Sequence, residues 1–78
     1  MSHFILPKGT ILDNYIYYRV INGHKVWCKE NKKRYFSWDS LHGEIEVFDL
    51  NGKHLGALNP FTGQKIKDAK KGRHLNVR

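Results

Sequence analysis

The chain has 78 residues, and 14 Lys and Arg against seven Asp and Glu give it a net charge of +7. This length predicts a single domain over residues 1–78, with a small core, because such a domain buries only about 60% of its unfolded surface. The single cysteine, Cys28, excludes an intrachain disulfide framework and a multi-cysteine zinc site. No segment approaches the roughly 20 apolar residues of a membrane span, so no membrane contact is expected.

The positive charge is concentrated near the C-terminus. Residues 61–78 contain six Lys and Arg and one acid, whereas residues 32–60 contain four of each sign. Such a basic segment favours a polyanionic partner such as RNA, and we assign Lys65, Lys70 and Lys71 to RNA binding. The alternative is a solvated basic tail that only keeps the protein soluble.

The sequence predicts a mainly β fold, α+β at most. We expect a small, highly twisted antiparallel sheet of successive hairpins, with irregular N-terminal and basic C-terminal segments. Residues 3–14 contain Pro7 and Gly9 and read as a loop or a short helical turn. Residues 15–21 and 24–29 then alternate as two strands, and Asn22-Gly23 forms the tight turn between them.

A second hairpin, built from residues 34–41 and 44–50, carries most of the acids of the chain. A two-residue turn, His42-Gly43, would set Leu41 opposite Glu44 and Asp39 opposite Glu46. Alternation sorts the side chains into two faces. Phe36, Trp38, Ile45 and Val47 form the predicted core face, and Asp39, Glu44 and Glu46 share the other face with His42 at its rim.

The acidic face is the candidate active site. Two carboxylates opposite each other repel, which tends to raise the pKa of one of them and suits it to act as a general base. The simpler interpretation is a solvated strand face. The clustering argues against it, because four of the seven acids lie within eleven residues of an otherwise basic chain.

A third hairpin begins at residue 44 and returns through residues 53–59. A two-residue Asn51-Gly52 turn would set Asp49 opposite His54, on the core face. A three-residue turn with a left-handed Gly52 and a bulge would instead set Phe48 opposite His54 and Glu46 opposite Gly56, so that His54 joins the acidic face. Turn chemistry alone leaves both registers open.

The C-terminal part follows a turn predicted at residues 60–63. Residues 64–78 have little periodicity and few apolar side chains. We expect them to be largely irregular and to lie on the sheet, with Arg73 brought to the site.

A family resemblance rests on a long run of residues. The run KRYFSWDSLHGEIE (33–46), followed by GKHLG (52–56) and NPFTG (59–63), resembles the C-terminal ribonuclease domain of the ribosomal-RNA-cleaving colicins and cloacin. The resemblance covers roughly residues 32–73 and does not extend to the first thirty residues.

The resemblance implies a bacterial toxin endoribonuclease that cleaves 16S ribosomal RNA in the small-subunit decoding region and so blocks translation. It implies that the domain is the C-terminal part of a larger toxin, secreted or delivered from the cell surface, which acts in the cytoplasm of a target cell. It also implies a cognate immunity protein, and the charge of the domain predicts that this partner is acidic.

RNA can be cut without a metal because its own 2′-hydroxyl attacks the phosphate, given a base, an acid and a cation. We assign Glu46 as the general base and His42 as the general acid. Asp39 orients the histidine or keeps it charged, and Arg73 stabilises the phosphate, an assignment that also fits the resemblance. Glu44, His54 and Lys67 are supporting members. The resemblance implies that His54 lines the site, so for the third hairpin we favour the three-residue turn with a left-handed Gly52.

Two alternatives stay open. Asp39, His42, Glu44 and Glu46 could ligate Mg²⁺ or Zn²⁺, but their spacing matches no familiar zinc or calcium motif, so we expect no metal and no cofactor. A noncatalytic RNA-binding module, such as a small ribosomal protein, would explain the basic charge and the aromatic residues. It would not explain acids beside a histidine, because acids weaken RNA binding.

Overall fold

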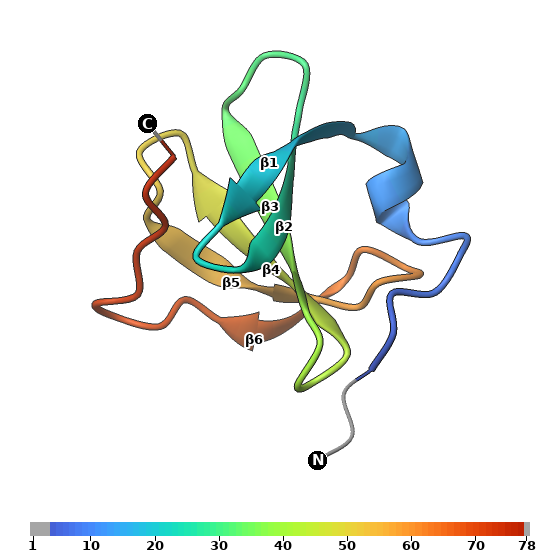
Figure 1. The fold of residues 1–78 in the computed structure, drawn as a ribbon. Helices are drawn as coiled ribbons and strands as arrows, with labels where there is room; N and C mark the ends of the chain where they lie inside the picture. The colour runs from blue at the N-terminus through green and yellow to red at the C-terminus, as the bar shows by residue number, and fades with distance from the viewer. Residues whose placement is uncertain (1–3, 78) are drawn as a thin grey trace.

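A computed structural model describes residues 4–77, which form a six-stranded antiparallel sheet with the strands in chain order (Figure 1). The elements are a short 3-10 helix η1 (Ile11–Asn14) and strands β1 (Ile16–Ile21), β2 (His24–Cys28), β3 (Arg34–Asp39), β4 (Glu44–Asp49), β5 (His54–Leu58) and β6 (Lys65–Asp68). The predicted fold class, a small antiparallel sheet of successive hairpins, is confirmed. Within this range no helix is long and apolar enough to cross a membrane.

The first hairpin has the predicted turn. Asn22 and Gly23 both have positive φ, at 52° and 79°, as a two-residue hairpin turn with the right-handed twist of its strands requires. The strands are interrupted by a bulge at Tyr18, because Tyr17 pairs with Trp27 and Arg19 with Val26. Cys28 is buried, as expected of a small apolar side chain.

The register predicted for the central hairpin is wrong by two residues. Asp39 pairs with Glu44, and Ser37 rather than Asp39 pairs with Glu46, so the loop contains residues 40–43. The strand ends at Asp39 because its side chain accepts the N–H groups of the next residues in an Asx-type turn, and its carbonyl accepts Gly43 N–H at 2.8 Å. Of the two predicted positive-φ positions only Gly43 has one, at 67°. A two-residue shift preserves the faces, so the face assignment is confirmed.

The third hairpin has the register that we favoured. Phe48 pairs with His54 across the three-residue loop 50–52, and Gly52 is left-handed with φ 86°. A bulge at Leu55 follows, so Glu46 pairs with Ala57 and not with the predicted Gly56. His54 therefore lies on the same face as Glu46.

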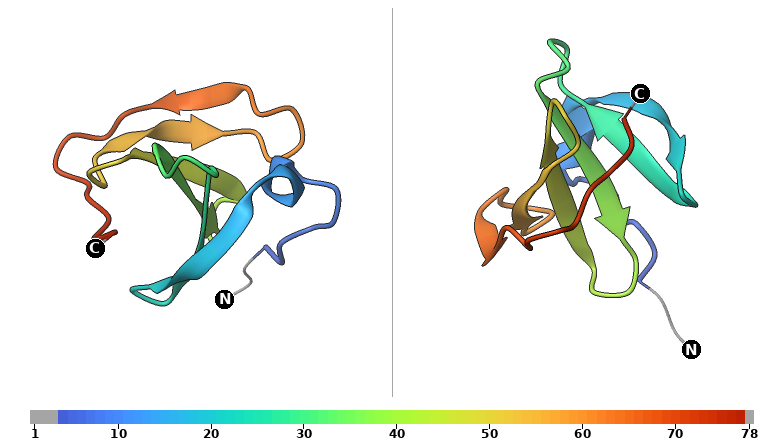
Figure 2. Two further views of the ribbon diagram at one scale, coloured as in Figure 1. Left: turned by 90° about the horizontal axis from the view of Figure 1, so that it is seen from above. Right: turned by 90° about the vertical axis from the view of Figure 1, so that its left-hand side faces the viewer.

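Both faces of the central hairpin are covered. One core contains the predicted Phe36, Ile45 and Val47 together with Leu12 of η1. The second core, on the acidic face, was not predicted; it contains Ile21, Val26, Cys28, Tyr35, Phe48, Leu75 and Val77. The sheet curls so that its first hairpin and the C-terminal segment close over this second face (Figure 2). The acids therefore lie at the edge of a core and not on an open strand face.

The C-terminal segment differs from the prediction in part. Residues 65–68 form the edge strand β6. All four of its residues are exposed, so no alternation of buried and exposed side chains marks this strand in the sequence. Residues 69–77 run without regular structure, but they are anchored: Leu75 N–H donates to Gly52 O at 2.8 Å, and Tyr18 Oη donates to Val77 O at 2.7 Å. A Cβ on Gly52 would lie 1.8 Å from Leu75 O, so only glycine permits this approach.

Candidate active site

A cleft separates the central hairpin from the C-terminal segment. One cavity of about 330 Å³ and a neighbouring one of about 210 Å³ share three lining residues, His42, Glu46 and Arg73. His54, Lys67 and Lys70 line the smaller cavity, and Asp39 lines the larger one. All four residues predicted to be catalytic therefore meet at one cleft, although Arg73 is 27 residues from Glu46 in the sequence.

Glu46 is the buried acid of this cleft. Its side chain is 11% exposed, and both carboxylate oxygens have partners. His54 Nε2 lies 2.8 Å from Oε2, and Arg73 donates to Oε1 through a guanidinium nitrogen. A buried carboxylate needs such donors, because burial otherwise disfavours the charged form. The expected pairing of Glu46 with Asp39 is wrong, since Ser37 takes the position opposite Glu46 and Asp39 lies opposite Glu44.

His54 is held in one tautomer by its two neighbours. The Lys70 backbone N–H donates to Nδ1 at 2.8 Å, which leaves the proton on Nε2, where it can be donated to Glu46. The imidazole is 3% exposed. His54 N–H also donates to Arg73 O at 3.2 Å, so this residue links β5, the Glu46 carboxylate and the C-terminal segment.

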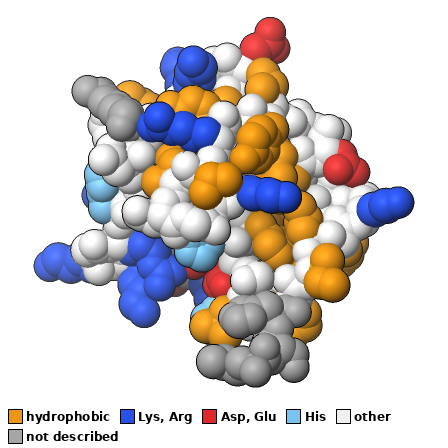
Figure 3. Space-filling model, viewed as in Figure 1, with side chains coloured by type: hydrophobic (Ala, Val, Ile, Leu, Met, Phe, Trp, Pro, Cys, Tyr) orange, Lys and Arg blue, Asp and Glu red, His pale blue; other side chains and the backbone are white. Residues whose placement is uncertain are grey.

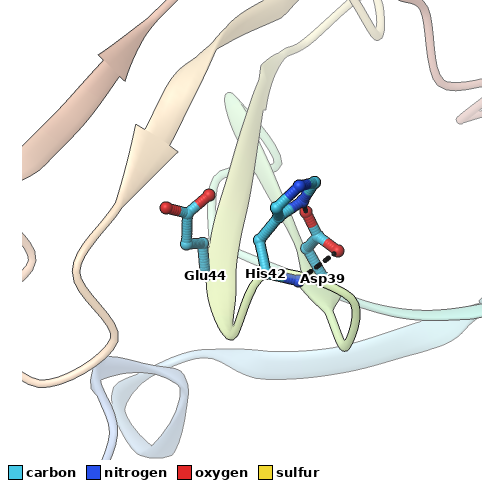
Figure 4. Close-up of side chains that lie close together, drawn as sticks. All are labelled: Asp39, His42 and Glu44. Carbon is cyan, nitrogen blue, oxygen red and sulfur yellow. Dashed lines mark hydrogen bonds and ion pairs between the residues drawn. The ribbon is translucent and has the colours of Figure 1, made fainter. Parts of the chain in front are cut away.

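His42 lies at the rim of the cleft and is oriented by Asp39. The ring Nδ1 of His42 is 2.8 Å from Asp39 Oδ2, and the backbone N–H of His42 donates to Asp39 Oδ1 at 3.2 Å (Figure 4). The ring is 52% exposed. This arrangement fixes Nδ1 and leaves Nε2 available to a substrate, which is the geometry that a carboxylate-oriented acid or base requires.

The pKa of Asp39 reflects these contacts. Burial acts to raise it, but hydrogen bonds from the His42 ring and from the His42 and Leu41 N–H groups outweigh burial and lower the pKa below its ordinary 3.8. A lowered folded-state pKa means that Asp39 stabilises the fold above its unfolded pKa, and that this contribution is lost as the pH falls through the folded value.

The lowered pKa of Asp39 gives the first prediction. The unfolding free energy that Asp39→Asn removes should be largest at about pH 7 and should shrink as the pH falls below 3.8 towards about pH 2, because the wild-type carboxyl group gains a proton as the pH falls through its lowered folded-state pKa. Urea unfolding of both proteins at the two pH values measures this difference. A difference that does not change with pH would contradict the assigned hydrogen bonds.

Glu44 and Lys67 form a second ion pair at the cleft, with Nζ 2.9 Å from Oε1. The hydrogen bond to Glu44 raises the pKa of Lys67, so the ammonium stays charged. Lys65 does not join them. A bulge in the β5–β6 pairing places Lys65 beside Leu58 and Lys67 beside Ala57, so that Lys65 faces the opposite side of the sheet.

Three of these side chains are close enough to hold a metal ion. Ligand atoms of Asp39, His42 and Glu44 lie within 4.8 Å of one another, and Figure 4 shows the three side chains near the hairpin tip. Each already has a partner: Asp39 and His42 bond to each other, and Glu44 pairs with Lys67. A bound ion would have to displace these contacts. Glu46 is not one of the three residues whose ligand atoms lie close together.

Sequence reasoning missed several residues of the larger cavity. Ser37, Asn22, His24, Phe48 and His74 also line it. His24 reads from the sequence as an exposed turn histidine, and only the folding of the first hairpin toward the C-terminal segment brings it here. Alternation from Phe36 could have placed Ser37 on the acidic face.

Comparisons with known proteins show the family of the chain. The family model described as Cytotoxic matches residues 21–76. Cloacin of Escherichia coli is 43% identical over 42 residues, which are 53% of this chain and 8% of cloacin. Colicin E3 and colicin E6 of the same organism are 39% identical over 44 residues and 38% identical over 42, again covering 8% of each relative.

The chain thus matches a short segment of much longer proteins, and the family match spans most of its own length. The resemblance to the cytotoxic ribonuclease domain of cloacin and the colicins is confirmed, and the chain belongs to the Cytotoxic family.

Proposed function

We propose that this domain is an endoribonuclease that cleaves 16S ribosomal RNA in the decoding region of the small ribosomal subunit, without a metal ion. Family membership supports a toxin that cleaves ribosomal RNA, and the geometry supports the chemistry. The observation that carries the proposal is Glu46: a buried glutamate that receives hydrogen bonds from His54 and Arg73, in a cleft shared with His42.

In the proposed reaction Glu46 accepts the proton of the ribose 2′-hydroxyl while O2′ forms a bond to the adjacent phosphorus. The bond from phosphorus to O5′ breaks, and His42 gives that oxygen its proton from Nε2. The products are a 2′,3′-cyclic phosphate and a 5′-hydroxyl. Each oxygen of Glu46 keeps a lone pair beyond its present hydrogen bond, so the base function is compatible with both partners.

Arg73 has two roles in this proposal. It donates a hydrogen bond to Glu46, and because its guanidinium is 42% exposed with donors to spare, it can also bind the phosphate oxygens whose charge grows in the transition state. Lys67 is the second cation at the cleft. Lys70 and Lys71 extend the basic surface, and Figure 3 shows Lys and Arg side chains gathered on the side of β6 and the C-terminal segment.

Purified ribosomes test the function. The domain should release one discrete fragment of 16S RNA from them. On a metal-stripped RNA substrate, the cleavage rate should be equal in excess chelator and with added Mg²⁺. A noncatalytic RNA-binding module would bind ribosomes and release no fragment. Loss of cleavage in chelator on a metal-stripped RNA substrate, restored by a divalent ion, would contradict the metal-free chemistry.

The second prediction separates catalysis from electrostatics. Arg73→Ala should lower the cleavage rate far more than the affinity for RNA, because Arg73 contacts Glu46. Lys71→Ala should leave the rate on bound RNA unchanged and should reduce the slope of affinity against salt by about one unit. Filter binding and single-turnover cleavage at several salt concentrations measure both effects. Equal effects of the two variants would make Arg73 only a part of the basic surface.

The wider setting is also a proposal. The domain would form the C-terminal part of a larger secreted or surface-delivered toxin, act in the cytoplasm of the target cell, and be neutralised by an acidic immunity protein. A net charge of +7 would speed association with such a partner and make the rate fall with salt. A protein encoded beside the toxin gene should block cleavage at physiological salt, and an unrelated protein of equal charge should not.

A further inference from the structure

The N-terminal segment contacts the loop that carries His42. Phe4 N–H donates to Ser40 O at 2.7 Å, and Trp38 Nε1 donates to Phe4 O at 3.1 Å. Figure 1 shows the segment descending toward the tip of the β3–β4 hairpin. Phe4, the first residue of a segment 4–6 that we call the strap, is thus hydrogen-bonded to the end of β3 and to the first residue of the 40–43 loop.

The Phe4 ring covers the other end of the same loop. A Cβ built on Gly43 would lie 3.1 to 3.4 Å from three ring carbons of Phe4, so the ring packs directly on the glycine backbone. Gly43 has φ 67°, which a residue with a side chain adopts only with strain. The glycine therefore permits both the turn and the close approach of Phe4.

His42 lies between these two contacts in the chain. Asp39 restrains the loop from the side of the cleft, where it accepts the Leu41 and His42 N–H groups. The strap restrains it at Ser40 and at Gly43. Hairpin tips held only by local hydrogen bonds open easily, and a small displacement of a catalytic group is costly, so a second restraint matters for the rate.

We propose that Phe4 is a positioning residue, which holds the 40–43 loop so that His42 stays aligned with the cleft. This inference rests on the ribonuclease function proposed above. It assigns a role to a segment outside the residues 21–76 that the family model matches. It also explains why an apolar ring that is 60% exposed is placed at the hairpin tip.

RNA binding by the same segment is a different role, which the experiment must separate. The strap borders a cavity of about 440 Å³ that Trp27, Trp38 and Lys25 also line. A base stacked in that cavity would lower KM. A positioning role acts on kcat instead, because the substrate binds equally well to a misaligned site.

The test compares Phe4→Ala with Phe61→Ala. Phe61 is equally exposed, at 58%, and lies in the β5–β6 turn, away from the cleft. On ribosomes, Phe4→Ala should lower kcat about 10-fold to 100-fold with KM unchanged, whereas Phe61→Ala should change neither. Phe4→Tyr keeps the ring and should restore the rate.

A second measurement does not depend on activity. Amide hydrogen exchange at Leu41 and His42 should become faster in Phe4→Ala, while the exchange of core amides such as that of Ile45 stays slow. Equal kinetics for Phe4→Ala and Phe61→Ala, or a change in KM alone, would overturn the positioning role. If the wild-type domain releases no RNA fragment, the ribonuclease proposal fails. If the wild-type domain cleaves RNA but Phe4→Ala and Phe61→Ala have equal kinetics, the positioning role alone fails.

Discussion

Glu46→Gln is expected to lower the cleavage rate by on the order of 10²–10⁴, because an amide cannot accept the 2′-hydroxyl proton. The fold should persist. The amide oxygen can still accept from His54 Nε2, and Arg73, which is 42% exposed, can turn to water when it meets the amide NH₂ group. RNA affinity should not fall, since the change removes a negative charge.

Single-turnover cleavage and RNA binding of the same preparation measure the two effects of Glu46→Gln. Glu30→Gln is the matched control, because it makes the same charge change at an exposed glutamate in the β2–β3 loop. Cleavage by Glu46→Gln at the rate of Glu30→Gln would place the general base elsewhere.

His42→Ala is expected to cost a similar factor, on the order of 10²–10⁴, because the departing 5′-oxygen loses its proton donor. Stability should change little, since the ring is 52% exposed and Asp39 keeps its contacts with the backbone. The exposure of the site also lets a small molecule enter the space left by the side chain, so added imidazole should restore part of the rate.

The pH dependence gives an independent check on His42. Wild-type activity should follow a bell-shaped profile, in which the rate falls when Glu46 gains a proton and again when His42 loses one. In His42→Ala the alkaline fall should disappear. An unchanged profile in this variant, with no rescue by imidazole, would remove His42 from the acid role.

Local patterns were enough to predict strands β1 to β5 and the faces of the site. Alternation over residues 34–50 placed Glu46 and the predicted core residues on opposite faces, and turn chemistry at Asn22-Gly23 set the first hairpin correctly. For the third hairpin, the family resemblance decided between two possible turns, and the pairing of Phe48 with His54 is as favoured. The central register was wrong because a two-residue His42-Gly43 turn was assumed, whereas the Asp39 side chain ends the strand two residues earlier.

Long-range packing could not be predicted in the same way. The contacts of Glu46 with His54 and Arg73 depend on a C-terminal segment held by Leu75 and Val77, two apolar side chains without periodicity. Their burial converts the acidic face into the edge of a second core. Glu46 was expected opposite Asp39, but its carboxylate is bound by two donors, and Asp39 lies opposite Glu44.

The chemistry of the new RNA ends tests the central claim most directly. Ribosomal RNA cut by this domain in excess chelator should carry a 2′,3′-cyclic phosphate on one fragment and a 5′-hydroxyl on the other, because the 2′-oxygen is the nucleophile. Mass spectrometry of the terminal oligonucleotides distinguishes these ends. A 3′-hydroxyl paired with a 5′-phosphate would show that water attacked the phosphate, and would contradict the roles given to Glu46 and His42.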